Sequence, residues 1–436
     1  MRWWNQFPLG LRHVTRLRLL TSIGAGGVIF MTPLVFHAID FSASEVGSGL
    51  AISALIGTAV RLLSGSLLDR GLSCSWPVRG TTILAILADF ILFRATSYPS
   101  YLLGQLLLGT AAGLYWPAIE LAVPLSCGPM PSSRGYALVR SGDALGIGIG
   151  ALIGTLAAMA GALRLVYGVE AVCMASVLIL ISINPLLSQR PDPGQSANRS
   201  EQESNQNSGR LSWLMPLMPV LGVSVVATGI LSLQQSALPL DLVRGGLERP
   251  GLSEGASGAL IALQLALLVI LQWPVGRWLS ERPPAFGLGL SLCSFSVGCL
   301  LLGLSSLLSQ GTGLVLLALL PMALAQAAFL PTATEAVIEE TPVEHRGLAM
   351  ALFSQCFAIS AVGAPLIAGA LLDLQGHGLL LWILMSGACL AVLPTLKRLR
   401  PRFKADGSLS EEAPHPQNSR QHQSIDVVTG GPGGLR

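Results

Sequence analysis

The sequence predicts an all-α membrane protein with twelve transmembrane helices in two pseudo-symmetric six-helix halves. Three observations lead to this prediction. Only 11% of the 436 residues are charged and 51% are hydrophobic, whereas about a quarter of the residues in ordinary globular domains are charged. The apolar residues gather in long blocks, and several short patterns recur at nearly one offset along the chain.

The apolar blocks are long enough to cross a bilayer, which takes about 20 residues per helix. The first block follows a basic N-terminal segment and is too long for the apolar region of a signal peptide, so we interpret it as an uncleaved span. The predicted spans are 17–39, 45–68, 78–96, 99–122, 136–160, 164–187, 212–239, 254–279, 284–308, 312–333, 347–371 and 377–396.

Two polar stretches divide the chain. Residues 188–211 have the composition of a flexible linker, and residues 397–436 that of a disordered tail rich in Pro, Gly, Ser and Gln. We therefore expect one six-helix half over 1–187 and another over 212–396.

The distribution of basic residues predicts the orientation. If both termini are cytoplasmic, the outer loops and helix ends hold only Arg94, Arg164, Arg244 and Arg249, and Arg61 lies inside a span. The other 21 of the 26 Lys and Arg residues then fall on the inner side, as the positive-inside rule requires. We expect both termini, the linker and the tail to be cytoplasmic.

The two halves carry matching patterns. Offsets of 206 to 214 residues relate the five matches, which is difficult to obtain by chance. The serines that open two of the matching segments, Ser44 and Ser253, are expected to cap the following spans. The matches are Pro33 with Pro239, 44–49 with 253–258, Gly65 with Gly276, Pro117 with Pro331, and Arg134-Gly135 with Arg346-Gly347.

This arrangement resembles the major facilitator superfamily of secondary transporters over residues 12–397. The most specific match is Gly65-Ser-Leu-Leu-Asp69-Arg70-Gly71, which resembles the family's G-x-x-x-D-R-x-G signature between spans 2 and 3. The resemblance implies a conformational motif made of Gly65, Asp69, Arg70 and Gly276. In it, the glycine allows close helix packing and the aspartate accepts N–H bonds from another helix.

Two further patterns bear on the subfamily. Residues 142–150 resemble the glycine pattern of the antiporter branch, with Ile147 in place of its proline, and favour an efflux-type transporter of organic solutes. Gln105 stands where the family usually has a span 4 arginine associated with proton coupling. This departure leaves uptake or facilitated diffusion open.

Charged residues near the cytoplasmic ends of spans 4 and 10 are candidates for an inner gate. Glu120 follows Pro117, Glu335 follows Pro331, and the basic partners expected for them are Arg134 and Arg346. Such pairs would form and break as the halves rock, although a static surface ion pair remains the alternative.

Ionisable residues inside the spans are candidates for proton coupling. Asp89 could relay a proton or could form a structural pair with Arg94. Arg140 and Asp143 share a helix face and could form an intrahelical ion pair. Alternatively, Arg140 binds an anionic group or Asp143 titrates during transport. His37 and Asp40, at the outer end of span 1, are candidates for an external proton port or for a solvated helix end.

Neutral polar and aromatic residues in the spans are candidates for contact with the solute, although each could equally serve helix packing. A cavity with few charges suits a neutral or amphipathic solute. The candidates are Tyr115, Trp116, Gln234, Gln235, Gln326 and Gln355.

Missing motifs exclude other classes of protein. The sequence has no P-loop, HExxH, GxSxG or paired Cys/His ligands, so we expect no enzyme activity, no cofactor and no metal. The seven scattered cysteines are interpreted as small buried residues. A net charge of +3 does not indicate a nucleic-acid partner.

The sequence therefore favours a monomeric transporter of the plasma membrane, surrounded by lipid, that exports a small organic solute in exchange for protons. Uptake or facilitated diffusion of a nutrient or sugar-like solute is one alternative. A transport-inactive membrane assembly or pigment-handling protein is another.

Overall fold

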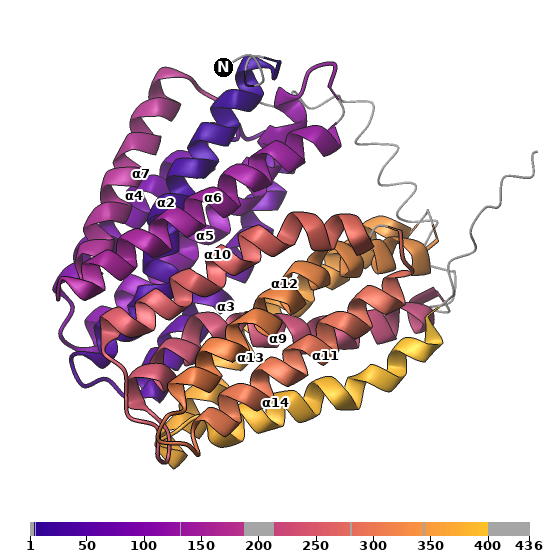
Figure 1. Cartoon of the computed structure of the whole chain (residues 1–436). Coiled ribbons are helices and arrows are strands. Elements are labelled where there is room, and N and C mark those ends of the chain that lie inside the picture. The colour runs from indigo at the N-terminus through magenta and orange to yellow at the C-terminus, as the bar shows by residue number, and fades with distance from the viewer. Residues whose placement is uncertain are drawn as a thin grey trace, which may run out of the picture. The chain divides into compact units, whose positions relative to one another are not determined.

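The computed structural model describes residue 4 and residues 6–130, 132–186, 213–279, 281–342 and 345–399. Twelve helices in this part of the chain are long and apolar enough to cross a membrane. They are α2 (Leu9–His37), α3 (Ala43–Asp69), α4 (Ser75–Arg94), α5 (Tyr98–Ser126), α6 (Ser132–Met159), α7 (Leu165–Ile183), α9 (Leu214–Arg244), α10 (Glu254–Leu279), α11 (Pro284–Ser305), α12 (Thr312–Glu340), α13 (Arg346–Gln375) and α14 (Leu379–Val392), which continues as a 3₁₀ turn, Leu393–Arg398 (Figure 1).

The twelve predicted spans correspond to these helices in order. The largest difference in where a span starts is in the first one, because α2 starts at Leu9 rather than at residue 17. The predicted linker and most of the predicted tail lie outside the described residues.

Local sequence sets the helix starts, with one correction to the prediction. The α3 N-terminus is closed by a capping box in which the Ser42 hydroxyl accepts from the Glu45 backbone N–H, and the Glu45 carboxylate accepts from the Ser42 N–H. The cap is therefore Ser42 and not Ser44. In the second half, Ser253 accepts from the Ala256 N–H, as predicted.

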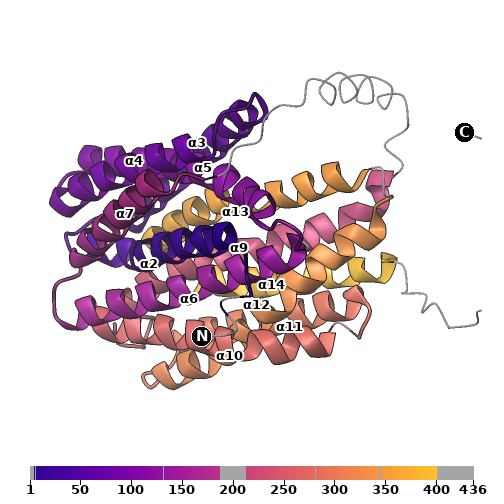
Figure 2. The same ribbon diagram turned by 90° about the horizontal axis from the view of Figure 1, so that it is seen from above.

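The packing of the first half, α2–α7, is repeated in the second half, α9–α14. In the first half α2 packs on α6 and α7, α5 packs on α3 and α4, and α4 packs on α7. The corresponding pairs of the second half, such as α9 with α13 and α10 with α12, also pack together. The halves meet where α3 packs on α13 and where α6 packs on α10, and Figure 2 shows α6 between α2 and α10.

We call the end of the bundle where α2 ends and α3 begins the loop end, and the opposite end the terminal end. At the loop end the backbones of the two halves touch. A Cβ on Gly47 would collide with the Pro365 carbonyl, and one on Gly369 would lie 2.6 Å from the Ala43 carbonyl oxygen. The Thr155 hydroxyl donates to the Gly258 carbonyl at 2.9 Å. Small residues thus hold the loop end closed.

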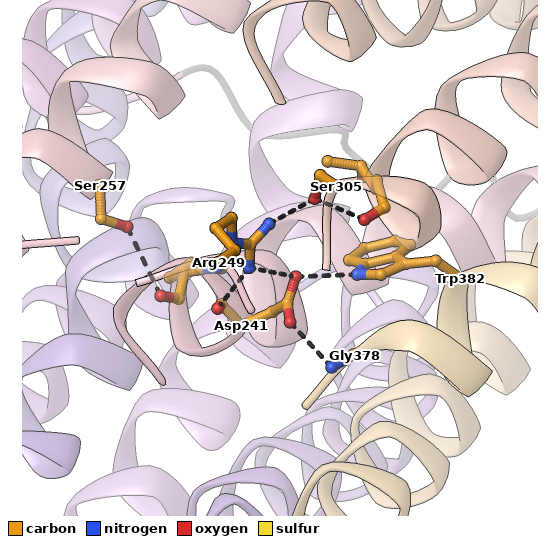
Figure 3. Close-up of polar contacts among 8 residues, drawn as sticks. Asp241, Arg249, Ser257, Ser305, Gly378 and Trp382 are labelled. Atoms are coloured by element: carbon orange, nitrogen blue, oxygen red, sulfur yellow. Dashed lines mark hydrogen bonds and ion pairs between the residues drawn. The ribbon is translucent and has the colours of Figure 1, made fainter. Parts of the chain in front are cut away.

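A buried ion pair fixes the loop end of the second half (Figure 3). Asp241 accepts hydrogen bonds from the backbone N–H of Gly378 at 2.9 Å and from the Trp382 indole at 3.1 Å. Arg249 pairs with the same carboxylate at 3.2 Å and donates to the Ser305 hydroxyl at 2.6 Å. Both charged side chains are fully buried, so this cluster ties the ends of α9, α11 and α14 together.

Candidate functional site

A cavity of about 310 Å³ lies among the helices of the first half. About half of its lining residues are Ala, Val, Ile, Leu or Met, contributed by six helices, and most of the others are neutral polar or aromatic residues. Its charged groups lie at two places along the cavity, Arg18 and Asp143 at one and Glu170 at the other. A cavity with apolar walls and a small number of placed polar and charged groups is typical of a small-molecule binding site.

Arg18 of α2 is the centre of the first polar group. Its guanidinium lies 2.9 Å from the Asp143 carboxylate of α6 and 3.9 Å from the centroid of the Trp116 ring of α5. Asp143 also accepts from the Ser22 hydroxyl, and Tyr115 lies 5.4 Å from the guanidinium. The cavity is therefore lined at this point by an ion-paired guanidinium and by the aromatic ring of Trp116 on which it lies.

Close contact between α2 and α6 brings Arg18 and Asp143 together. A Cβ on Gly146 would lie 2.7 Å from the Leu19 carbonyl oxygen, and one on Gly150 would collide with the Ile23 carbonyl. The glycine pattern of residues 142–150 therefore sets the spacing of these helices. Only small residues allow such an approach inside a membrane.

The structure corrects the predicted pairing of Arg140 with Asp143. Asp143 turns toward α2 and pairs with Arg18, because the glycine contact places that guanidinium across the helix interface. Arg140 is exposed and lines a separate groove of about 1140 Å³ between α6 and α10, together with Trp273 and Gly276.

Asp89 lies at the second polar group, beside Glu170. The Arg94 guanidinium lies 4.7 Å from the centroid of the Phe90 ring, and no ion pair joins it to Asp89 in the described part of the chain. The alternative of an Asp89–Arg94 pair is therefore wrong. The carboxyl group that faces Asp89 is that of Glu170 on α7, a residue to which the sequence assigned no role.

Gly65 and Gly276 do not have the close packing predicted for them. A Cβ on either residue would meet no atom within 4 Å, and Gly276 borders the groove between α6 and α10. Arg70 is exposed. The Asp69 side chain lies outside the described part of the structure, so its predicted contact stays a prediction.

The predicted gate pairs stay untested for a similar reason. Glu120 and Glu335 are half-buried near the terminal ends of α5 and α12, where the repeat places them. The side chains of Arg134 and Arg346 lie outside the described part of the structure. The Tyr136 hydroxyl donates to the Glu120 carbonyl at 3.1 Å.

Three of the four predicted glutamines gather between the halves. Gln234, Gln235 and Gln326 surround a cavity of about 20 Å³ with Gln264 and with Phe30 of α2. Gln355 is exposed on α13 and does not line this cavity. Tyr115 and Trp116 line the larger cavity of the first half.

His37 and Asp40 lie at the loop end, next to an ion pair that joins α9 and α13. Asp373 of α13 pairs with Arg244 of α9 at 2.9 Å, and both groups act electrostatically on His37. Asp40 is exposed and has a φ of 67°. His37 is half-buried, so it lies at the edge of the closed end rather than in the cavity.

Asp373 also connects the two halves. Its carboxylate accepts from the backbone N–H of Ala43 at 3.0 Å and of Ser44 at 2.7 Å. These are free N–H groups at the start of α3, where the helix dipole favours a negative charge. The Asp373 carboxylate is thus a latch across the loop end.

Sequence reasoning missed Arg18 and Asp373. A first span starting at residue 17 places Arg18 at the membrane surface, whereas α2 starts at Leu9 and carries it inward. Asp373 could have been found from the sequence by asking which acidic residues neutralise the few basic residues at this end. Arg244 and Arg249 each have a carboxylate partner nearby, Asp373 and Asp241.

Comparisons with known proteins agree on the fold. The sequence profile of the Major Facilitator Superfamily matches residues 17–246 and 220–425. None of the curated proteins matches the chain.

Solved transporters have a similar fold at low sequence identity. A mutant of nucleoside transporter NupG has a TM-score of 0.73 at 13% identity, covering 89% of this chain and 99% of its own. A POT family transporter in complex with 5-aminolevulinic acid has a TM-score of 0.72 at 11% identity, covering 89% and 96%. A mutant of peptide transporter POT in complex with sulfate has a TM-score of 0.71 at 16% identity, covering 89% and 94%.

Proposed function

Because the chain belongs to the Major Facilitator Superfamily, we propose that it moves a small organic solute across the membrane by alternating access and exports it in exchange for protons. Family membership makes the chain a multi-pass membrane transporter rather than an enzyme. The solute, the direction and the coupling are the proposed parts.

The observation that carries the proposal is the Arg18–Asp143 pair in the wall of the first-half cavity. Ionisable residues inside a membrane bundle are costly unless they are paired or serve a pathway. Here the pair is only partly closed, since the Asp143 side chain remains 22% exposed. A solute with an apolar body and one polar or charged group would stack on Trp116 and exchange hydrogen bonds with the pair.

The proposed orientation places both termini in the cytoplasm of a monomer in the plasma membrane. The basic residues support it, because 21 of the 26 Lys and Arg residues then lie on the inner side. In that orientation the closed loop end faces outward and the groove between α6 and α10 widens toward the cytoplasm. The structure would then represent an inward-facing state, in which Gly65 has no packing partner.

Export is supported by the glycine contacts of α6 with α2, which follow the pattern typical of the antiporter branch. Gln105 lines the cavity where the family usually has an arginine, so any proton must be carried by other groups. Uptake and facilitated diffusion are the outcomes that a flux experiment would separate from export.

The test is a flux screen in liposomes that contain the purified protein and trapped pyranine, a pH-sensitive dye. Ethidium, uridine, glycylglycine and glucose would represent an amphipathic cation, a nucleoside, a peptide and a sugar. Solute-dependent proton movement is expected with at least one class. Solute flux that ignores the pH gradient would contradict proton exchange, and no flux in a wider panel would contradict transport.

Two tryptophans provide a matched pair of variants. Trp116→Ala removes the ring beneath Arg18 and is expected to lower flux at least tenfold. Trp273→Ala removes a ring that is 78% exposed in the groove between α6 and α10 and should leave flux within twofold. Equal effects of both variants would contradict a solute site in the first-half cavity.

A further inference from the structure

Two carboxyl groups face each other at the loop-end side of the first-half cavity. Asp89 of α4 is 1% exposed and Glu170 of α7 is 4% exposed, and the two lie within hydrogen-bonding reach of each other. Glu170 also lines the cavity that contains Arg18 and Asp143. At 1.5 Å per residue, both carboxyl groups lie about 8 Å below the loop end of their helices.

No positive charge compensates this pair within the described part of the chain. Both Asp89 oxygens and the Glu170 Oε2 are buried without a hydrogen-bond donor. The basic residues at this end are engaged elsewhere: Arg94 lies over the Phe90 ring, and Arg164 donates to the backbone carbonyls of Phe93 and Ala95.

Two buried carboxylates in contact cannot both stay ionised in a low-dielectric interior. The arrangement is stable when one carboxyl is protonated and donates to the other, as in paired catalytic carboxyls. A metal ion would need more ligands, and the described residues contain no group of three side chains that could hold one. A shared proton is therefore the ligand that fits.

The other titratable groups near the pair are neutral or already paired. Tyr167 of α7 shares a hydrogen bond with Thr32 at 3.1 Å. Cys173 of α7 and Tyr101 of α5 are buried. From α6 and α2, the charged groups that line the cavity are Arg18 and Asp143. They pair with each other, and Arg18 lies about 9 Å along α2 from Gly24, the residue against which Glu170 packs.

We propose that the Asp89–Glu170 pair binds the proton that drives transport. The pair takes up one proton on one oxygen and shares it while the loop end is closed. It releases that proton when the opposite state exposes it. Only an O–H bond forms and breaks. This proposal rests on the proposed transport, because the cavity would link proton binding at Glu170 to solute binding at Arg18.

The first test detects the proton directly by infrared difference spectroscopy of the purified full chain as the pH is stepped. The wild-type protein should show a carboxylic acid C=O band that is lost or shifted in both Asp89→Asn and Glu170→Gln. Asp40→Asn, at an exposed carboxylate, is the control and should leave this band unchanged. A band that persists unaltered in both variants would overturn the proposal.

The second test needs no variant. Dicyclohexylcarbodiimide reacts with protonated carboxyl groups in apolar surroundings, and mass spectrometry locates the adduct. We expect the adduct on Asp89 or Glu170 and none on Asp241, which is equally buried but paired with Arg249. Equal labelling of Asp241, or no label on either member of the pair, would overturn the proposal.

Flux in liposomes separates this proposal from the proposed function. For whichever solute of the panel moves, Asp89→Asn and Glu170→Gln should each lower the accumulation driven by a pH gradient at least tenfold relative to solute exchange without a gradient, whereas the exposed Asp40→Asn should change neither more than about twofold. Wild-type levels of driven accumulation in both variants would overturn the proton site. Failure of the wild-type protein to move any solute would instead contradict the proposed function. The infrared and the carbodiimide-labelling tests would still decide whether the pair binds a proton.

Discussion

The interiors of the two six-helix halves differ in where they hold charge, although their helices pack alike. In the first half, Arg18 and Asp143 lie deep in their helices and line a cavity. In the second half, Asp241 and Arg249 lie at the loop end and are fully enclosed. The second half also contains neutral polar contacts between buried helices, such as Thr228 with Ser360 and Ser296 with Ser386.

The same fold thus uses a buried ion pair in two ways. An ion pair closed by further hydrogen bonds, as around Asp241, holds helix ends in place. An ion pair that borders a cavity has room to change partners. We therefore expect the Asp241–Arg249 pair of the second half to have a structural role and the Arg18–Asp143 pair of the first half to have a role in transport.

The largest expected effect is the loss of stability in Asp241→Asn. The variant leaves the Arg249 charge buried without its carboxylate, which should lower the free energy of unfolding by about 3–5 kcal/mol. Thermal unfolding in detergent measures this loss, with the exposed Asp40→Asn as a control that should stay within about 0.5 kcal/mol. An altered solute preference at unchanged stability would show that the comparison is wrong.

Arg18→Gln should have the next largest effect on stability and should abolish most transport. The free energy of unfolding should fall by about 1.5–3 kcal/mol, since Asp143 loses a charged hydrogen bond but keeps some exposure to the cavity. The double variant Arg18→Gln/Asp143→Asn should recover stability without recovering flux. Recovery of flux as well would make this pair structural, like that of the second half.

The comparison also explains which features the sequence could predict. The twelve spans and the repeat follow from apolar block length and from spaced prolines and glycines, which local physics determines. The partners of Asp143, Asp89 and Asp373 depend on which helices touch. Spacing along one helix favoured Arg140 for Asp143, but the glycines of α6 brought Arg18 closer. Glu170 gained a role only when α7 was placed beside α4.

A smaller effect is expected from Asp373→Asn, which weakens the latch between the halves. Loss of the carboxylate at the α3 N-terminus and of the ion pair with Arg244 should cost about 1–2 kcal/mol. That cost should shift the population roughly 5- to 30-fold toward the state that is open at the loop end.

Spin labels at the exposed positions Asp40 and Leu374, with the exposed Cys293 replaced, would measure this shift as a longer distance. Asp69→Asn provides the contrasting variant, since its predicted contact belongs to the opposite state. It should change the transport rate and shift the population toward the state seen here, with little change in solute preference. Identical shifts in both variants would contradict latches at opposite ends.

The smallest expected effect is that of Gln234→Ala, at a neutral polar side chain of the second half that lies next to the cavity between the halves. Gln234 donates to the Met322 sulfur at 3.7 Å, a weak bond, so its loss should cost about 1 kcal/mol or less. Concentration-dependent flux should show KM rising no more than about fivefold. If the variant instead lost transport as completely as Arg18→Gln, solute binding would depend equally on both halves. The solute site would then lie at the glutamines between the two halves rather than in the first-half cavity.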